Sequence, residues 1–375
     1  MYIYQDPAWP NFTWDKDSVA ARLVAVSKSA GFLAGRLSSI GLEGQIGAVA
    51  ETVSQDIMTS YEIEGVQLNT DQVRSSVARR LGVPTPNDTP SSHYIDGIVE
   101  MMLDATTNYH TPLTDERLFG WHNCLFPNGR SGYTTIDVAK YRSSGMKVVS
   151  GNYGRERVHY IAPEAATIPG MMSQFLTWFN GDNTGNDYIK SAIAHLWFVS
   201  IHPFEDGNGR IGRAIADMAL SKAEGSSMRY FSMSRQINKD KKSYYDILEK
   251  TRNSGCDITP WLTWYMDCMT KAIAASDQML SKVLDKASFW QRHSQMTMTD
   301  RQKTVLNIYL DGYTGKLTVK NWAKHAHISS DTAARDIGDL VQKDVLVPQE
   351  GRVRDISYAI RVSPGRLLHF GVETY

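Results

Sequence analysis

The sequence lacks three features that mark membrane proteins, secreted proteins and proteins that bind nucleic acid by bulk charge. No run of about 18 apolar residues occurs, so no membrane-spanning helix is expected. The opening "MYIYQDPAWPNFTWDKDS" has neither a basic start nor an apolar core, which predicts no secretory signal. Lys and Arg together number 40, as do Asp and Glu, so the net charge is zero. This balance argues against binding of nucleic acid by bulk charge, while binding through a local basic patch is still allowed.

Cysteine is also scarce, with only Cys124, Cys256 and Cys268 in 375 residues. The odd number and the spacing match no zinc or redox motif, which predicts reduced thiols in a cytoplasmic protein. Apolar residues make up 42% and charged residues 21%, a composition typical of globular proteins. The length leaves room for two or three domains.

Residues 1–93 read as an N-terminal helical domain that ends in a polar, proline-bearing loop over 83–93. Apolar spacing predicts three helices within it, over 14–40, 44–66 and 69–82. Candidate N-cap residues precede the first and third helices: Asp15 or Asp17, and Asn69 or Thr70. The second helix is expected to end near Gly65.

Residues 94–284 read as a second, mainly helical domain with one β-prone interruption. The runs "KVVS" (147–150) and "RVHYIA" (157–162) flank "GNYG", which predicts a hairpin. In residues 285–375, three helical segments precede two β-prone runs. That order is the order of a winged helix-turn-helix domain.

The stretch "HPFEDGNGRIGR", from His202 to Arg213, concentrates reactive and anion-seeking groups between two helices. A glycine-bearing turn at a helix N-terminus presents backbone N–H groups that bind anions. Arg210 and Arg213 lie three residues apart and suit a polyphosphate. Asp206 supplies the oxygen ligand that Mg²⁺ takes beside phosphates, and His202 can act as a general base.

At these residues the chain resembles the Fic family, whose signature is H-x-F-x-(D/E)-G-N-G-R-x-x-R. The resemblance covers about residues 95–275, and it implies a mainly α fold with a Fic-type helical core and a small β-hairpin flap. The fixed positions of the signature are His202, Phe204, Asp206, Gly207, Asn208, Gly209, Arg210 and Arg213. It also implies transfer of AMP from ATP to a Ser, Thr or Tyr hydroxyl of a protein target. Self-AMPylation and a homodimer remain open.

The resemblance assigns a role to each position of the signature. His202 would deprotonate the incoming hydroxyl, and Phe204 would fix the loop from the core. Asp206 would hold Mg²⁺, and Asn208 would cradle phosphates with the backbone of Gly207 and Gly209. Arg210 and Arg213 would bind the β- and γ-phosphates of ATP.

Two neighbouring segments resemble further parts of the family core. The hairpin resembles the flap that holds a target segment by strand addition, although a plain connecting hairpin stays an alternative. Its candidate target-binding residues are Val158, His159, Tyr160 and Ile161. Tyr244 and Tyr245 are candidates for the adenine end of the nucleotide site, and packing is the alternative.

The earlier stretch "SYEIEGV" resembles the inhibitory helix of some Fic proteins, (S/T)-x-x-x-E-(G/N), with Ser60, Glu64 and Gly65 in place. Ser60 and Glu64 are spaced to share one helix face, and Gly65 is a plausible C-cap. By resemblance, Glu64 would pair with Arg213 and keep it from the γ-phosphate. In some family members with this inhibitory helix, the same glutamate helps to remove AMP from the target. The resemblance therefore does not decide between addition and removal of AMP.

The sequence of the C-terminal domain is compatible with three roles: binding DNA, binding a protein partner, or forming a dimer. A basic face is expected from Lys320, Lys324, Arg335, Lys343, Arg352 and Arg354. Three acids on the expected recognition helix, Asp331, Asp336 and Asp339, weaken the DNA hypothesis because they would face phosphates. An alternative function is therefore a DNA-binding regulator that uses the Fic core as a nucleotide-sensing switch.

Overall fold

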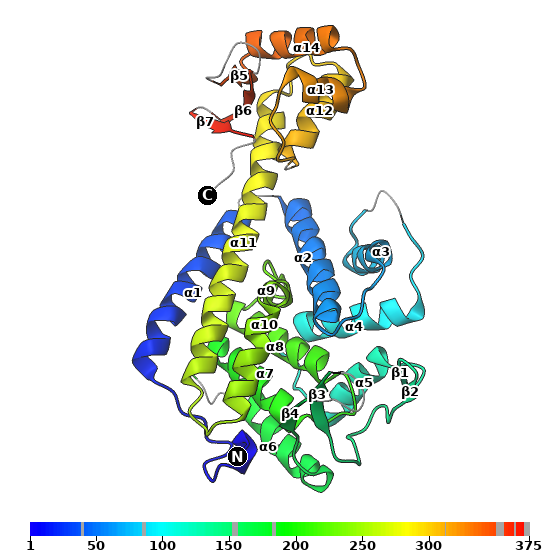
Figure 1. The fold of residues 1–375 in the computed structure, drawn as a ribbon, viewed down its shortest axis with the longest axis vertical. Coiled ribbons are helices and arrows are strands. Elements are labelled where there is room, and N and C mark those ends of the chain that lie inside the picture. The colour runs from blue at the N-terminus through cyan, green and yellow to red at the C-terminus, as the bar shows by residue number, and fades with distance from the viewer. Residues whose placement is uncertain are drawn as a thin grey trace. The chain divides into compact units, whose positions relative to one another are not determined.

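The computed structural model describes residues 1–38, 41–84, 88–151, 157–181, 185–311, 313–349, 356–363 and 365–370. It is mainly helical, with a few short antiparallel strands (Figure 1). It divides into two compact units, Met1–Ser276 and Asp277–Tyr375. Among the described residues, none of the helices is long and apolar enough to cross a membrane. Cys124, Cys256 and Cys268 are free thiols.

The first unit is built from helices around a buried central pair. Its helical elements are η1 (Ile3–Gln5), α1 (Lys16–Leu37), α2 (Leu42–Ile63), α3 (Thr70–Leu81), α4 (His93–Thr107), α5 (Asp115–Leu125), η2 (Ala165–Thr167), α6 (Ile168–Asn180), α7 (Asp187–Ile201), α8 (Asn208–Glu224), α9 (Met233–Lys239) and α10 (Lys241–Arg252). The first part of α11 (Thr259–Arg292) also belongs to it, and the rest of that helix belongs to the second unit. Its strands are β1 (Arg130–Ser131), β2 (Thr134–Thr135), β3 (Lys147–Ser150) and β4 (Arg157–Ile161).

Helices α7 and α8 pack against each other at the centre of this unit. Every residue of α7 after Asp187 is buried, including the polar residues Lys190, Ser191, His195 and Ser200. At Gly212 of α8, an added Cβ would lie 2.9 Å from the Cγ1 atom of Val199 on α7. The glycine therefore permits the close approach of the two helices that carry the ends of the His202–Arg213 stretch.

The N-terminal helices do not stand apart from this core, although the sequence predicts a separate domain over 1–93. Helix α2 packs against α9, α3, α4 and α8. At the very N-terminus, Trp9 and Phe12 contact the Trp197 ring of α7 edge-on. The backbone N–H of Thr13 donates to the Cys256 carbonyl at 2.9 Å. The expected boundary near residue 93 thus lies within one compact unit.

Two helices begin where the sequence predicts, at N-cap residues that it identifies. Asp15 caps α1, since its side chain accepts from the N–H groups of Asp17 and Ser18, and Asn69 caps α3. The boundary between the units is less legible, because it lies inside the continuous 34-residue helix α11. No linker composition marks it, which explains why the sequence suggests 284/285 rather than 276/277.

The second unit has its own core, formed by residues such as Leu306, Trp322, Ile337 and Ile360. Its elements after α11 are α12 (Asp300–Leu310), α13 (Val319–Ala326), α14 (Ser330–Gln342), β5 (Leu346–Pro348), β6 (Tyr358–Ser363) and β7 (Arg366–Leu368). The strands form one antiparallel sheet in the order β5-β6-β7. Three helices followed by strands is the expected order, while the winged-helix assignment stays a prediction.

Candidate active site

The loop from His202 to Gly207 connects α7 to α8 in a well-defined conformation. His202 ends α7 with a left-handed backbone, φ 53°. The Asn208 side chain spans the loop: its Oδ1 accepts from the Phe204 N–H at 2.9 Å and its Nδ2 donates to the Phe204 carbonyl at 2.8 Å. Phe204 itself is fully buried. The side chains of Phe204 and Asn208 therefore hold the loop in shape.

This geometry corrects the expectation that the Asn208 side chain would cradle phosphates. Its amide is buried, and both its oxygen and its nitrogen are engaged with the backbone of Phe204. What remains for an anion is the backbone of the first turn of α8, because the first N–H groups of a helix have no intrahelical acceptor. Asn208 thus shapes the anion site rather than lining it with its side chain.

Gly207 and Gly209 each leave space that a side chain would fill. Gly207 has φ 82°, and an added Cβ would lie 3.0 Å from carbon atoms of both Leu125 and Phe126. At Gly209, an added Cβ would lie 2.3 Å from Oε1 of Glu64. The Glu64 carboxylate therefore rests directly against the first turn of α8.

Asp206 presents a partly exposed carboxylate beside this turn, with 41% of the side chain accessible. The Ser131 hydroxyl donates to its Oδ2, and the Gly207 N–H donates to its Oδ1 at 2.5 Å. Nη2 of Arg210 lies 3.3 Å from Oδ1. The carboxylate is thus oriented from two sides and keeps access to solvent.

Arg210 and Arg213 are both buried, and they have different neighbours. The Arg210 guanidinium lies 5.0 Å from the Tyr61 ring centroid and 4.9 Å from that of Phe126. Arg213 is held by α2: its Nε donates to the Ser60 hydroxyl, and its Nη2 donates to the Ser60 carbonyl and to Glu64 Oε1, each at 2.8 Å.

The contact expected between Glu64 and Arg213 is therefore present, with an N–O distance of 2.8 Å. Glu64 is the C-cap residue of α2, one position beyond the last helical residue, and Gly65 follows with φ 79°. The left-handed glycine ends the helix and lets the chain turn away after Glu64.

His202 is neutral at pH 7 in this environment. Burial, followed by the positive charge of Arg252, lowers the pKa of His202 to about 4. Its Nδ1 lies 3.2 Å from the Val199 carbonyl, which can only accept, so Nδ1 carries the proton. The lone pair is then on Nε2, the nitrogen that is able to take a proton. The pKa is lower than the near-neutral value that suits a general base.

Two residues that the sequence did not single out position this loop. Arg142 is buried and donates to the carbonyls of His202, Ser144 and Pro163 at 2.8, 2.6 and 2.6 Å. His122 accepts at Nδ1 from the Ala139 N–H, so its Nε2 carries a proton and lies 3.2 Å from the Asp206 carbonyl. Its ring also stacks on Phe204 with a centroid separation of 4.3 Å.

The hairpin is formed by β3 and β4, which pair antiparallel with a register shift between Val148 and Val149. Val158 and Ile161 are exposed, as a target-binding strand requires. His159 is engaged with Ser150 and Glu249, at 2.5 and 2.6 Å. Tyr160 departs from expectation: it is fully buried and its hydroxyl donates to the Ser200 carbonyl at 2.6 Å. It anchors the hairpin to α7 and is not available to a target.

The two tyrosines proposed for the adenine end also differ from each other. Tyr244 is buried, and its hydroxyl lies 2.8 Å from Nε2 of His195 on α7. Its position corrects the nucleotide-contact prediction in favour of packing. Tyr245 is 40% exposed, and its hydroxyl donates to the Ile63 carbonyl at the end of α2 at 3.2 Å. Only Tyr245 remains a candidate for nucleotide contact.

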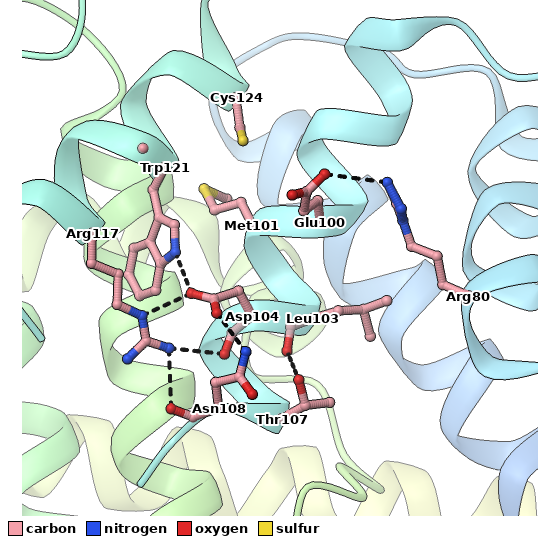
Figure 2. A pocket seen from close by; sticks show the side chains of 11 residues that line it. Arg80, Glu100, Met101, Leu103, Asp104, Thr107, Asn108, Arg117, Trp121 and Cys124 are labelled. Atoms are coloured by element: carbon pink, nitrogen blue, oxygen red, sulfur yellow. Dashed lines mark hydrogen bonds and ion pairs between the residues drawn. The ribbon is translucent and has the colours of Figure 1, made fainter. Parts of the chain in front are cut away.

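A separate pocket of about 430 Å³ lies at α3, α4 and α5 (Figure 2). Asp104 accepts there from Arg117, Trp121 and Asn108, at 2.8, 2.8 and 2.7 Å. Arg80 pairs with Glu100 at 3.4 Å. These charged groups satisfy one another, and the pocket residues of α5 differ from those that contact the His202–Arg213 loop. The pocket is therefore distinct from the candidate active site.

Two family models match the chain, in line with this geometry. Residues 112–220, which include the whole His202–Arg213 loop, match the model of the Fic/DOC family. The chain contains a Fic/DOC domain. Residues 2–83, which include α1 to α3 and Glu64, match a second model described as a domain of unknown function, DUF4172. The Fic domain and this N-terminal domain share one compact unit.

Known proteins extend the similarity beyond the Fic domain itself. A protein adenylyltransferase Fic from Culex quinquefasciatus is 27% identical over 236 residues, covering 60% of this chain and 42% of that protein. One from Drosophila mojavensis is 30% identical over 232 residues, covering 60% and 41%. The chain thus spans about two fifths of the length of these relatives.

A solved structure shows that the fold is shared. The crystal structure of a Fic family protein from Desulfovibrio desulfuricans G20 has a TM-score of 0.53 to this chain at 18% identity. The superposition covers 93% of this chain and 97% of that chain. At this level of identity the likeness shows the Fic fold alone.

Proposed function

We propose that this chain is a protein adenylyltransferase, which transfers AMP from ATP to a Ser, Thr or Tyr hydroxyl of a protein target. The observation that carries the proposal is the loop geometry. One rigid turn joins the neutral imidazole of His202 to the N-terminus of α8, with Asp206, Arg210 and Arg213 beside it. The names of the relatives favour transfer over the alternative of a nucleotide-sensing regulator.

The reaction is a displacement at the α-phosphorus of ATP. The hydroxyl oxygen of the target forms a bond to this phosphorus, and the bond to the β-phosphate bridging oxygen breaks, which releases pyrophosphate. The hydroxyl proton moves to Nε2 of His202, whose Nδ1 already holds a proton toward Val199. Backbone N–H groups at the start of α8 oppose the negative charge that builds on the phosphoryl oxygens.

The expected magnesium ion fits the carboxylate of Asp206. Mg²⁺ is commonly bound by one or two carboxylates together with substrate phosphates, and Asp206 is accessible and oriented by Ser131. Within the described ranges, no group of three or more His, Cys, Asp or Glu side chains is placed to hold a metal unaided. When bound, the ion would neutralise phosphate charge.

The contact between Glu64 and Arg213 supports a self-inhibited ground state. Three hydrogen bonds from Arg213 to Ser60 and Glu64 commit this guanidinium to α2. The Glu64 carboxylate also lies against Gly209, in the first turn of α8 that would receive phosphate. Glu64 therefore opposes the binding of ATP in two ways. It engages the Arg213 guanidinium, and it places a negative charge beside the anion site.

The test compares AMP incorporation from ATP radiolabelled at the α-phosphate, with cell lysate as the source of targets. We expect Glu64→Gly to label targets at least ten times faster than the wild type. Glu62→Gly is the matched control, because Glu62 lies on the same helix end but bonds to Asn238 rather than to Arg213. Adding His202→Ala to Glu64→Gly should abolish the labelling.

Different failures of this test point to different errors. Equal labelling by the wild type and the Glu64→Gly variant would show that Glu64 does not inhibit. No labelling by any folded variant would overturn AMP transfer itself. Labelling of the enzyme alone would identify self-modification, and mass spectrometry of the product would locate the adduct.

A further inference from the structure

The second unit presents two of its helices as a rigid helix-turn-helix. Helix α13 is followed by its C-cap residue His327, which has a left-handed backbone with φ 53°. Two residues later Ser329 caps α14, where its hydroxyl accepts from the Thr332 N–H at 3.3 Å. Trp322 of α13 and Ala333 of α14 are fully buried in the same core. The short turn and the shared core fix the two helices to each other.

Two of the three acids that weaken the DNA hypothesis are engaged by partners within this unit. Asp336 is buried, and its carboxylate accepts from Nε and Nη2 of Arg301 at 2.8 and 2.7 Å. Asp339 accepts from the Gln302 amide at 2.9 Å and from Nζ of Lys343 at 2.8 Å. Their charge is compensated by partners within the unit, so it does not oppose a phosphate backbone.

The outward face of α14 carries small residues between polar ones. Beyond the first residue Ser330, the exposed residues of the helix are Asp331, Ala334, Arg335, Gly338 and Gln342. This spacing places them along one side of the helix, opposite the side that Ala333 and Ile337 bury in the core. A helix with small residues on its outer side can come close to another surface.

The neighbouring helix α13 carries two exposed positive charges. Lys320 and Lys324 are exposed there and lie one helical turn apart. In the part of this unit that the structure describes, neither lysine forms an ion pair, whereas Arg301, Lys343 and Arg361 do. The two lysines are therefore available to an anionic partner.

We propose that this face of α13 and α14 binds duplex DNA, with α14 in the major groove. At about 1.5 Å per residue, the 13-residue α14 is about 20 Å long, and the major groove admits a helix. Ala334 and Gly338 allow its backbone to approach the groove floor. Arg335 and Gln342 reach toward base edges, while Lys320 and Lys324 meet phosphates.

Charge favours DNA as the occupant of this face. Residues 277–375 contain 14 Lys and Arg against 11 Asp and Glu, a net charge of +3, although the whole chain is neutral. The expected basic residues Arg352 and Arg354 lie outside the described residues and do not support this binding mode. DNA binding through this face is independent of AMP transfer, since it uses no residue of the first unit.

The test is fluorescence anisotropy of a labelled, random-sequence 20-base-pair duplex with the full chain at 50 and 200 mM NaCl. Non-specific binding typically has a Kd of about 10⁻⁴ to 10⁻⁶ M at physiological salt, so micromolar binding is expected at 50 mM. The double variant Lys320→Glu/Lys324→Glu should weaken binding at least tenfold. A plot of the logarithm of the binding constant against the logarithm of the salt concentration has a negative slope. The double variant should reduce the size of this slope by about one for each phosphate that is no longer neutralised. Arg335→Glu should weaken binding as well.

Lys303→Glu is the matched control, because Lys303 is exposed on α12, forms no ion pair among the described residues, and gives the same charge change as Arg335→Glu and the same change per substitution as the double variant. It should alter the affinity less than twofold. Absence of binding at 50 mM NaCl, or equal weakening by Lys303→Glu, would overturn the proposal. Equal competition by a polyglutamate peptide would assign the face to an acidic protein segment instead. Thermal unfolding of each variant excludes loss of fold.

Discussion

Single side chains far from the signature hold its loop in a reactive shape. Arg142 binds the carbonyl of His202 and both ends of the hairpin region at Ser144 and Pro163. His122 binds the carbonyl of Asp206 and stacks on Phe204. Neither touches the reacting atoms, so we regard both as positioning residues. They account for how a glycine-bearing loop stays ordered.

The titration of His122 gives a pH prediction. Burial lowers its pKa to about 4 in the folded chain, against an ordinary value of 6.5. The unfolded chain therefore takes up a proton that the folded chain does not. Stability from this group is complete above pH 6.5 and is lost as the pH falls toward 4. We expect His122→Gln to bind about one proton fewer on unfolding between pH 5 and 6 than the wild type.

Urea midpoints of the wild type and of His122→Gln at pH 5, 6 and 7 measure this difference. Glutamine is chosen because it can still donate to the Asp206 carbonyl and accept from the Ala139 N–H. Parallel pH profiles for the two proteins would contradict the assignment. In the Glu64→Gly background, AMP transfer by His122→Gln should exceed that by His122→Phe, which keeps the stacking on Phe204 but removes both hydrogen bonds.

Helix α2 acts as one element, because its middle contacts Ser232 and Ser234 at the start of α9 while its end contacts Arg213 of α8. Near its middle, Asp56 is buried and accepts from the Ser232 hydroxyl and from the Ser234 N–H. Asp217 of α8 lies beside it and pairs with Arg229 at 3.1 Å. Burial, and then the charge of Asp56, raises the pKa of Asp217. Loosening the contact of Asp56 with Ser232 and Ser234 should therefore weaken the pairing of Glu64 with Arg213, two turns further along α2.

We predict that Asp56→Ala raises AMP transfer above the wild type but below Glu64→Gly. The substitution leaves the Ser232 hydroxyl and the Ser234 N–H without an acceptor, which costs on the order of 1–3 kcal/mol and weakens the docking of α2. Asp56→Asn keeps an acceptor oxygen and should stay near wild-type activity. Initial rates and melting curves on the same samples test this. A lower Tm with unchanged transfer would show that α2 does not respond as one element.

At the scale of the whole molecule, the chain has two cores joined within α11. The first contains the N-terminal helices together with the Fic domain, and the second contains α12 to α14 with the small sheet. Each core buries its own apolar side chains, so each is expected to unfold cooperatively by itself.

We predict two calorimetric transitions for the full chain, and three matched Leu→Ala variants assign them. Leu33 of α1, Leu196 of α7 and Leu306 of α12 are all buried, so each substitution should cost about 2–5 kcal/mol. Leu33→Ala and Leu196→Ala should lower the same transition, whereas Leu306→Ala lowers the other. If Leu33→Ala lowered a third transition by itself, residues 1–93 would be a separate domain after all.

The sequence by itself determined the features whose signals are local. The stretch from His202 to Arg213 covers the turn after α7 and the start of α8, and its signature residues lie within twelve consecutive positions. The caps at Asp15 and Asn69 are local for the same reason. The contact between Glu64 and Arg213 spans 149 residues and was predicted only through resemblance to a family.

Tertiary structure decided the features that depend on contacts between distant segments. Arg142 meets His202 across 60 residues, Ser131 meets Asp206 across 75 and His122 meets Asp206 across 84. Packing also decides which of two alike side chains is available. Tyr244 is buried while Tyr245 is exposed, and Asp336 is turned inward while Asp331 is not. A sequence pattern states what a side chain can do, but burial and partners decide whether it is free to do it.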